Sequence, residues 1–185
     1  MKRYVSFLVL LMTAICLQAQ DFQQFFNDST LRLDYIFAGD KKSQHICLDQ
    51  LHESAGWYGR RHHLDQLPLE GNGDITMKDA ATGTVIYRHS FSTLFQEWLS
   101  TAEARQTSRS FENVFLVPYP RQAVEITVTL RDYHARTMAS MTHRVNPTDI
   151  LIRRQHQQSR YTTIHAAADT ARCIHVAFVA EGYTI

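Results

Sequence analysis

The segment over residues 123–131, AVEITVTLR, alternates apolar and polar side chains along most of its length. A period of two is typical of a β-strand that turns one face to a hydrophobic core and the other to solvent. Residues 31–37, LRLDYIF, repeat the pattern and place four large apolar side chains on one face. Because a sheet with one apolar face must cover it with another layer, these strands predict packed β-sheets.

The rest of the chain contains further β-prone segments, separated by glycine, proline and polar turn residues. The predicted strands are 31–37, 45–51, 74–79, 84–89, 113–119, 123–131, 138–145 and 149–153, and the first four form two hairpins. Gly83 lies in the second hairpin and is able to adopt a positive φ there. Residues 92–104 instead carry apolar side chains at helical spacing, and Ser92 or Thr93 can cap a helix. The predicted fold class is mainly β, an immunoglobulin-like β-sandwich of about seven strands with one short helix.

Residues 1–20 have the pattern of an export signal. Lys2 and Arg3 precede a short apolar run, and a small residue, Ala19, stands before the polar mature sequence. The run is shorter than the roughly 20 residues that a membrane span needs. We therefore expect an exported protein, periplasmic, cell-surface or secreted, with no membrane span after cleavage. An uncleaved anchor and lipid attachment at Cys16 are the alternatives.

The composition narrows the classes of partner. The formal net charge is +1, so the chain lacks the basic excess that nucleic-acid binding requires, and no nucleic-acid partner is expected. Cleavage after residue 20 leaves Cys47 and Cys173. Their apolar neighbours predict two separately buried thiols, although an exported protein also permits a disulfide between them.

Motifs that carry chemistry are missing from the sequence. It has no His-Glu-x-x-His, no Gly-x-Ser-x-Gly and no glycine-rich phosphate loop. Adjacent histidines in an extended chain point to opposite faces, as would His45 and His52 on an unbroken strand, so neither pair is expected to bind a metal. The residues considered and given surface or packing roles are His45, His52, His62, His63, Asp34, Asp49 and Glu53. No catalytic, cofactor-binding or metal-binding residue is therefore predicted.

The most unusual stretch, GWYGRRHHLDQLPLEGNG at residues 56–73, joins the two predicted hairpins. Its glycines and Pro68 allow bends. Its arginines can donate to loop carbonyls or to a carboxylate such as Asp65. We expect a structural corner in which at least one arginine is hydrogen-bonded within the domain. The signature residues are Trp57, Gly59, Arg60, Arg61, Leu64, Gly71 and Gly73, with Trp57, Tyr58, Leu64, Leu67 and Leu69 as apolar anchors.

The C-terminal part of the chain changes character. Residues 155–163 are polar, whereas residues 173–180, CIHVAFVA, are almost continuously apolar. Such a run is typical of a strand buried on both faces, as in a parallel sheet. The predicted organisation is a signal peptide at 1–20, a β-sandwich at 21–154, a linker at 155–172 and, at 173–185, the first strand of a truncated α/β catalytic domain.

Four stretches together resemble a known family. They are LRLDYIFAGD at 31–40, the long block at 56–98, ENVFLVPYPRQAVEITVTLRD at 112–132, and HVAFVAEGYT at 175–184. The first three resemble the N-terminal domain of the secreted bacterial IgA-peptidase-type zinc metallopeptidases, metallopeptidase family sixty-four. The fourth resembles the opening strand of the catalytic domain in that family.

The resemblance implies a β-sandwich joined to a zinc-dependent catalytic domain, in which a His-Glu-x-x-His helix binds the metal. None of those catalytic residues is present here, so zinc is expected only in the missing catalytic domain. The chain itself is expected to be a non-catalytic accessory domain. Its implied partners are its own catalytic domain and a protein substrate such as immunoglobulin. The alternative is a free-standing immunoglobulin-like binding or adhesion module of the bacterial cell envelope.

Overall fold

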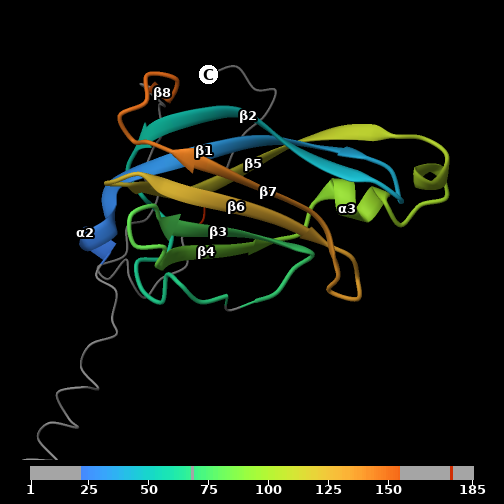
Figure 1. The fold of residues 1–185 in the computed structure, drawn as a ribbon, viewed down its shortest axis with the longest axis horizontal. Coiled ribbons are helices and arrows are strands. Elements are labelled where there is room, and N and C mark those ends of the chain that lie inside the picture. Colours follow the sequence, from blue (N-terminus) through green and yellow to red (C-terminus); the bar gives the residue numbers. More distant parts are fainter. Residues whose placement is uncertain (1–21, 68, 155–175, 177–185) are drawn as a thin grey trace, which may run out of the picture.

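A computed structural model describes residues 22–67, 69–154 and 176 of the 185-residue chain. Within these residues, eight strands form two four-stranded sheets that pack on one another as a β-sandwich (Figure 1). The predicted mainly β fold is therefore confirmed.

The strands divide between two sheets, which we name sheet A and sheet B. Sheet A has the order β5-β1-β2-β8, with β1 (Phe26–Gly39), β2 (Gln44–Ala55), β5 (Arg109–Pro120) and β8 (Arg153–Arg154). Sheet B has the order β4-β3-β6-β7, with β3 (Gly73–Asp79), β4 (Val85–Phe91), β6 (Val124–Arg131) and β7 (Thr137–Val145). Both predicted hairpins are confirmed as antiparallel pairs, and Gly83 has the expected positive φ of 72°. Only β2 and β8 pair in parallel among the described strands.

Three short helical segments accompany the sheets: α2 (Phe22–Phe25), α3 (Leu94–Trp98) and the 3₁₀ helix η1 (Glu103–Arg105). The predicted helix at 92–104 is thus shorter than expected. Its cap is confirmed, because the Thr93 side chain accepts a hydrogen bond from the backbone N–H of Gln96 at 3.4 Å. Beyond Trp98 the chain turns into η1, where the carbonyl of Ala104 accepts the backbone N–H of Lys41 from the β1–β2 turn.

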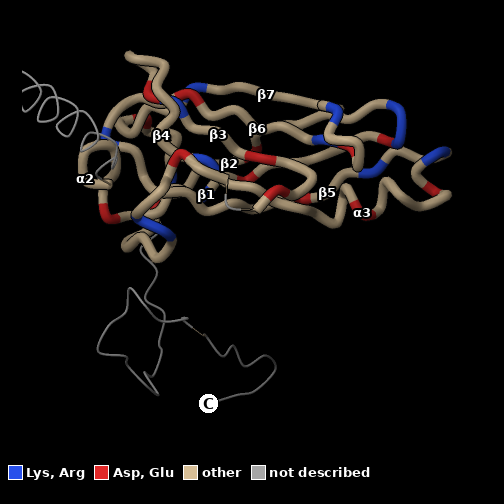
Figure 2. The backbone as a smooth tube through the Cα atoms, turned by 90° about the horizontal axis from the view of Figure 1, so that it is seen from below, with Lys and Arg blue, Asp and Glu red and all other residues tan. Residues whose placement is uncertain are grey.

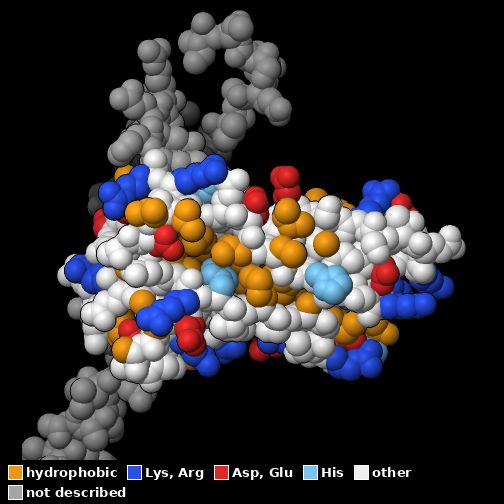
Figure 3. Space-filling model, turned by 45° about the horizontal axis from the view of Figure 1, so that its top comes forward, with side chains coloured by type: hydrophobic (Ala, Val, Ile, Leu, Met, Phe, Trp, Pro, Cys, Tyr) orange, Lys and Arg blue, Asp and Glu red, His pale blue; other side chains and the backbone are white. Residues whose placement is uncertain are grey.

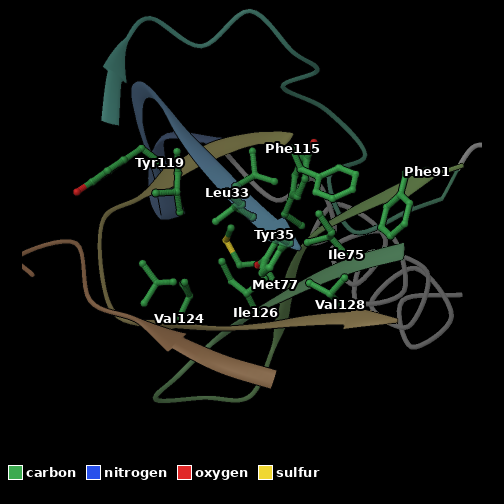
Figure 4. Close-up of a cluster of buried hydrophobic side chains, with 14 of the residues drawn as sticks. Leu33, Tyr35, Ile75, Met77, Phe91, Phe115, Tyr119, Val124, Ile126 and Val128 are labelled. Atoms are coloured by element: carbon green, nitrogen blue, oxygen red, sulfur yellow. The ribbon is translucent and has the colours of Figure 1, made fainter. Parts of the chain in front are cut away.

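The core lies between the two sheets, where the alternating strands present their apolar faces. The inward-facing side chains of β1 and β6 are each exposed by 1 % or less: Leu31, Leu33, Tyr35, Phe37, Val124, Ile126, Val128 and Leu130. Figure 4 shows Leu33 and Tyr35 directed toward Met77 and Ile126 of the opposite sheet. Aromatic rings fill much of this space, and Phe37 contacts the rings of Tyr35, Phe91, Phe95 and Phe115.

A β-bulge in β2 changes which side chains face the core. Asp34 pairs with Gln50 but Tyr35 pairs with Leu48, so Asp49 is an extra residue without a partner on β1. The bulge reverses the alternation, and His45 and His52 lie on the same outer face of sheet A instead of opposite faces. Cys47, also on that face, is exposed. The prediction of a buried Cys47 thiol is therefore wrong.

The predicted strand at 149–153 is also mostly wrong. Residues 150 and 151 form a turn, and only Arg153 and Arg154 pair with β2. The signal peptide, the linker, Cys173 and most of the predicted strand at 173–180 lie outside the described residues. Val176, the one residue of that run that is described, is 69 % exposed and belongs to no strand.

Charged residues are spread over the described chain. Figure 2 shows basic and acidic residues interspersed along both sheets and their loops. Among the described helices, none is both long and apolar enough to span a lipid bilayer.

Candidate functional site

The stretch GWYGRRHHLDQLPLEGNG, residues 56–73, forms a corner beside strands β1 and β4. Trp57 is buried, with 7 % of its surface exposed. Its indole Nε1 donates to the carbonyl of Arg60 at 3.0 Å, and its ring meets that of Tyr87 edge-on. The Leu64 side chain is fully buried. The corner is therefore anchored in the core by one aromatic and one aliphatic side chain.

Arg60 ties the corner to the neighbouring strand. Its guanidinium donates to the carbonyls of His63 at 2.7 Å, of Leu64 at 3.1 Å, and of Arg88 on β4. It also lies 5.4 Å from the centre of the Tyr87 ring. Arginine suits this position because its planar fork offers several donors in fixed directions. The expected hydrogen bonding of at least one arginine is thus present.

Arg61 makes a second, more exposed set of contacts. It forms an ion pair with Asp28, donates to the carbonyl of Trp57 at 3.1 Å, and lies over the Phe22 ring at 4.7 Å. Its carboxylate partner is Asp28 and not Asp65, the residue suggested from the sequence. The hydrogen bond from Arg61 is the largest cause that lowers the pKa of Asp28.

The glycines of the stretch are required by close contacts. A Cβ on Gly59 would overlap the Trp57 ring, and one on Gly71 would overlap the Phe91 carbonyl. A Cβ on Gly73, at the start of β3, would overlap the Phe91 ring. These three signature glycines therefore allow neighbouring groups to approach the backbone.

Two of the predicted anchors do not pack. Tyr58 is 90 % exposed and Leu69 is 81 % exposed, so neither holds the connection to the sandwich. His62 and His63 are exposed as well, and His63 has a positive φ of 52°. The apolar anchoring rests on Trp57 and Leu64.

Replacing Arg60 by alanine should destabilise the domain by about 2 kcal/mol, since three backbone carbonyls lose a charged donor. Urea unfolding of the variant measures the loss. Arg61→Ala is the matched control, and its effect should be much smaller because its partner Asp28 is largely exposed. Equal losses for the two variants would contradict the assignment of Arg60 as the central tie.

Asp34 and His52 form a small cluster on the outer face of sheet A, with Arg32 and Gln50. Asp34 is only 9 % exposed and accepts two hydrogen bonds from Arg32, at 2.7 and 2.9 Å. His52 Nε2 lies 3.5 Å from the Asp34 carboxylate and 3.1 Å from the Gln50 amide oxygen. The interpretation of Asp34 as a solvated side chain is therefore wrong, because an arginine on its own strand pairs with it. Asp49 is exposed, and Glu53 pairs with Arg154 of β8 at 3.3 Å.

A tyrosine–histidine pair crosses the interior of the sandwich. The Tyr35 hydroxyl lies 2.7 Å from Nε2 of His143 on β7. Burial lowers the pKa of His143 and raises that of Tyr35. His143 is therefore held neutral in the folded protein at pH values where an exposed histidine takes up a proton.

This pair predicts a pH dependence of stability. Below about pH 6.5 the unfolded chain binds a proton that folded His143 resists, so stability falls as the pH is lowered from 6.5 toward 5. The slope for one such proton is at most about 1.4 kcal/mol per pH unit. His143→Gln retains an acceptor for Tyr35 and should flatten the slope, measured by urea unfolding at several pH values. His62→Gln, at an exposed histidine, should leave it unchanged; identical slopes in both variants would rule out His143 as the source.

A cavity of about 790 Å³ lies between α3 and the turn that joins β6 to β7. Two large side chains at its margin are exposed, Tyr133 by 87 % and Leu94 by 71 %. Gln96, which lines it from α3, donates to the carbonyl of Asn72. The cavity offers apolar surface together with amide and guanidinium groups.

One side of the sandwich is open between β2 and β7, which lie side by side but belong to different sheets. We define the open seam as the inward-facing side chains Ile46, Leu48, Leu51, Ala139 and Met141. Leu48 is 38 % exposed and the others are only partly buried, in contrast to their counterparts on β1 and β6. Figure 3 looks onto this side and shows hydrophobic side chains gathered along its middle. The sequence did not reveal this surface, since each of its residues reads as part of a core.

The described residues contain no group of three His, Cys, Asp or Glu side chains placed to hold a metal ion. A search of curated proteins finds no match to the chain. Comparison with models of protein families finds a match to the family described as peptidase M64 N-terminus, over residues 21–142. The matched range contains the corner and strands of both sheets. Because this match covers most of the chain, the protein belongs to the peptidase M64 N-terminus family.

Proposed function

We propose that this chain is the non-catalytic N-terminal accessory domain of a secreted zinc metallopeptidase of the IgA-peptidase type. The observation that carries the proposal is the match over residues 21–142 to a family described as the N-terminus of a peptidase. The domain supports and orients a catalytic domain that follows it in the same polypeptide. Residues 1–20 direct export, so the first residue of the exported protein is expected near Asp21.

The zinc of the proposed peptidase has no ligand set among the residues that the structure describes. We place the metal in the catalytic domain that follows, and no catalytic role is given to any residue of this chain. The corner around Trp57 and Arg60 has a structural part in this proposal, because its donors and rings are already engaged within the sandwich.

The reading frame beyond Ile185 tests the proposal directly. We expect a His-Glu-x-x-His motif within the next few hundred residues, as a metallopeptidase domain requires. A stop codon immediately after Ile185 would contradict it. Purified residues 21–185 should show no peptidase activity with or without zinc, and zinc-dependent proteolysis by them would assign the chemistry to this chain instead.

A role in engaging protein substrate is the second element of the proposal, supported by the cavity between α3 and the β6–β7 turn. Immunoglobulin is the probe, and surface plasmon resonance with residues 21–185 is the measurement. Binding should weaken at least about tenfold when Tyr133 and Leu94 are both replaced by alanine, since exposed aromatic and aliphatic side chains dominate such contacts. Val114→Ala, at an exposed residue of sheet A, is the control. No measurable binding by the parent domain would remove the recognition role and leave that of support.

The alternative is a free-standing binding or adhesion module of the cell envelope. The exposed Tyr133 and Leu94 at the margin of the cavity favour this alternative, because a binding module needs an accessible surface and no second domain. A stop codon after Ile185 together with immunoglobulin binding that depends on Tyr133 would select this function over the first.

A further inference from the structure

The cavity between α3 and the β6–β7 turn is next to a smaller one, and Tyr133 borders both. The smaller cavity has a volume of about 340 Å³ and lies between this turn and the start of β3. The two cavities share four lining residues, Asn72, Arg131, Asp132 and Tyr133. Figure 1 shows α3 and the β6–β7 turn at the same end of the sandwich. We call the two cavities together the end groove; each has a volume in the range of about 300–1,000 Å³ that is usual for ligand sites.

A well-braced turn presents the Tyr133 ring to this groove. The Asp132 carboxylate accepts hydrogen bonds from the backbone N–H groups of His134 and Arg136, both at 2.9 Å, and from Nε of Arg136 at 2.8 Å. Ala135 has a positive φ of 62°, which a non-glycine residue keeps only where its surroundings hold it. The Tyr133 ring is 87 % exposed and lies 3.9 Å from the His134 ring, centre to centre. An aromatic ring is thereby held in solvent, where it needs little rearrangement to meet a ligand.

The walls of the larger cavity carry polar side chains that are free to bind. Lys41, Gln44 and Glu97 have no side-chain hydrogen bond or ion pair among the residues that the structure describes. An ammonium group donates hydrogen bonds, a carboxylate accepts them, and an amide does both. The two arginines of this cavity are already paired with Asp74 and Asp132. A ligand that fits these walls therefore both donates and accepts hydrogen bonds and carries little net charge.

An extended peptide fits the end groove less well than it fits a strand edge. Peptides that add to a sheet bind through main-chain hydrogen bonds. The walls of the groove are mainly a helix and two turns, whose main-chain groups bond within the domain. The N–H of Leu99 donates to the carbonyl of Phe95, and that of Ala135 donates to the carbonyl of Asp132. Recognition in this groove therefore depends on the polar side chains and on the Tyr133 ring.

A sugar ring combines the features that these walls select. Its C–H face is apolar and packs flat against an aromatic ring, whose face carries partial negative charge. Its hydroxyl groups both donate and accept hydrogen bonds, as serine and threonine hydroxyls do. Two adjoining cavities on either side of one exposed ring suit a chain of several sugar units.

We propose that the end groove binds an oligosaccharide, with one sugar ring stacked on Tyr133. The side chains of Lys41, Gln44 and Glu97 bond the hydroxyl groups of the unit that enters the larger cavity. The inference deepens the recognition role proposed above and rests on it, because a glycan attached to a protein substrate then becomes the part that the domain contacts.

An array of N-linked and O-linked oligosaccharides, probed with purified residues 21–185, tests the proposal. We expect binding to at least one oligosaccharide, which then serves as the ligand in calorimetric titrations. Tyr133→Ala should weaken this binding at least about tenfold, because the stacking surface is lost. Tyr133→Phe keeps the ring and should retain most of the affinity. Tyr58→Ala is the matched control, since it removes a tyrosine that is 90 % exposed and does not line the groove; urea unfolding confirms that all three variants fold.

Several outcomes would overturn the assignment. Absence of binding to every oligosaccharide on the array is one, and equal losses in Tyr133→Ala and Tyr58→Ala are another. A further measurement compares immunoglobulin before and after enzymatic removal of its glycans. Binding that is lost on removal, and that the released glycans inhibit, supports the proposal. Binding that survives removal and still depends on Tyr133 would assign the groove to a peptide instead.

The oligosaccharide site and the peptidase function can fail separately. A stop codon after Ile185 would contradict the peptidase function and leave oligosaccharide binding by residues 21–185 intact. A His-Glu-x-x-His motif beyond Ile185, together with an array that shows no binding, would support the peptidase function and refute the oligosaccharide site.

Discussion

Replacing Phe37 by alanine is expected to lower the free energy of unfolding by about 3–5 kcal/mol. Phe37 is completely buried on the inner face of β1. Its ring centre lies 5.9–6.4 Å from those of four other aromatic side chains, contributed by β1, β4, β5 and α3. Removal of the ring leaves a cavity. The four elements around it cannot all shift inward to fill it. Net stabilities of single domains are about 5–15 kcal/mol, so the loss is a large part of the whole.

Urea unfolding followed by tryptophan fluorescence measures this loss, since Trp57 and Trp98 are both largely buried. Tyr133→Ala is the control, because it removes a ring of similar size that is 87 % exposed. The control should change the free energy of unfolding by no more than about 0.5 kcal/mol. A loss below about 1 kcal/mol for Phe37→Ala would mean that the aromatic cluster is loosely packed, contrary to the structure.

The central strands could be predicted from the sequence because each has one apolar face throughout. On β1 and β6, strict alternation specified both the strand and the side that faces the core. In β2 the same reasoning failed at Asp49. No glycine marks the bulge there, and an extra residue in an apolar–polar alternation reverses every later side chain. The reversed orientation brought His52 to the same outer face as His45, and Cys47 is exposed on that face.

The corner was predictable in type but not in detail. The two adjacent arginines of this glycine-rich stretch indicated that at least one of them would donate hydrogen bonds to backbone carbonyls. Arg60 does this. The local pattern did not indicate which of the adjacent residues Trp57 and Tyr58 would turn inward. Trp57 is buried and Tyr58 is exposed, because Gly59 leaves space for the indole against the backbone.

The pairing of Asp34 was within reach of the sequence. Residues two apart on a strand share a face, so Arg32 and Asp34 were predictable as neighbours. Burial of the Asp34 side chain was not, since His52 of the neighbouring strand lies against it.

The open seam could not be predicted, because it is a property of strand order. Ile46, Leu48 and Met141 have the pattern of core residues, and they would be fully covered if β2 and β7 were central strands. Only the tertiary arrangement makes β7 an edge and leaves most of β2 without a second strand partner among the residues that the structure describes. Partly exposed apolar surfaces of this kind are therefore hidden among residues that a sequence assigns to the core.

Replacing Arg131 by methionine should destabilise the domain by about 3 kcal/mol, because it leaves the Asp74 carboxylate buried without its counter-charge. The Asp74 side chain is 5 % exposed and accepts from Arg131 and, at 3.1 Å, from Thr76. Methionine preserves most of the apolar stem of the arginine, so the measured loss reports the charge and its hydrogen bonds. Urea unfolding at pH 7 is the measurement.

A double-mutant cycle separates the ion pair from simple packing. Asp74→Asn keeps the shape of the side chain and removes the charge that Arg131 balances. The variant with both Asp74→Asn and Arg131→Met should be more stable than Arg131→Met alone, with a coupling energy of about 1–2 kcal/mol. Additive losses would contradict the interpretation that an unpaired buried carboxylate causes the destabilisation. Arg131 also lines the cavity beside α3 and donates its backbone N–H to Asn72. Its pairing with Asp74 would then fix the β6 margin of that cavity as well as stabilise sheet B.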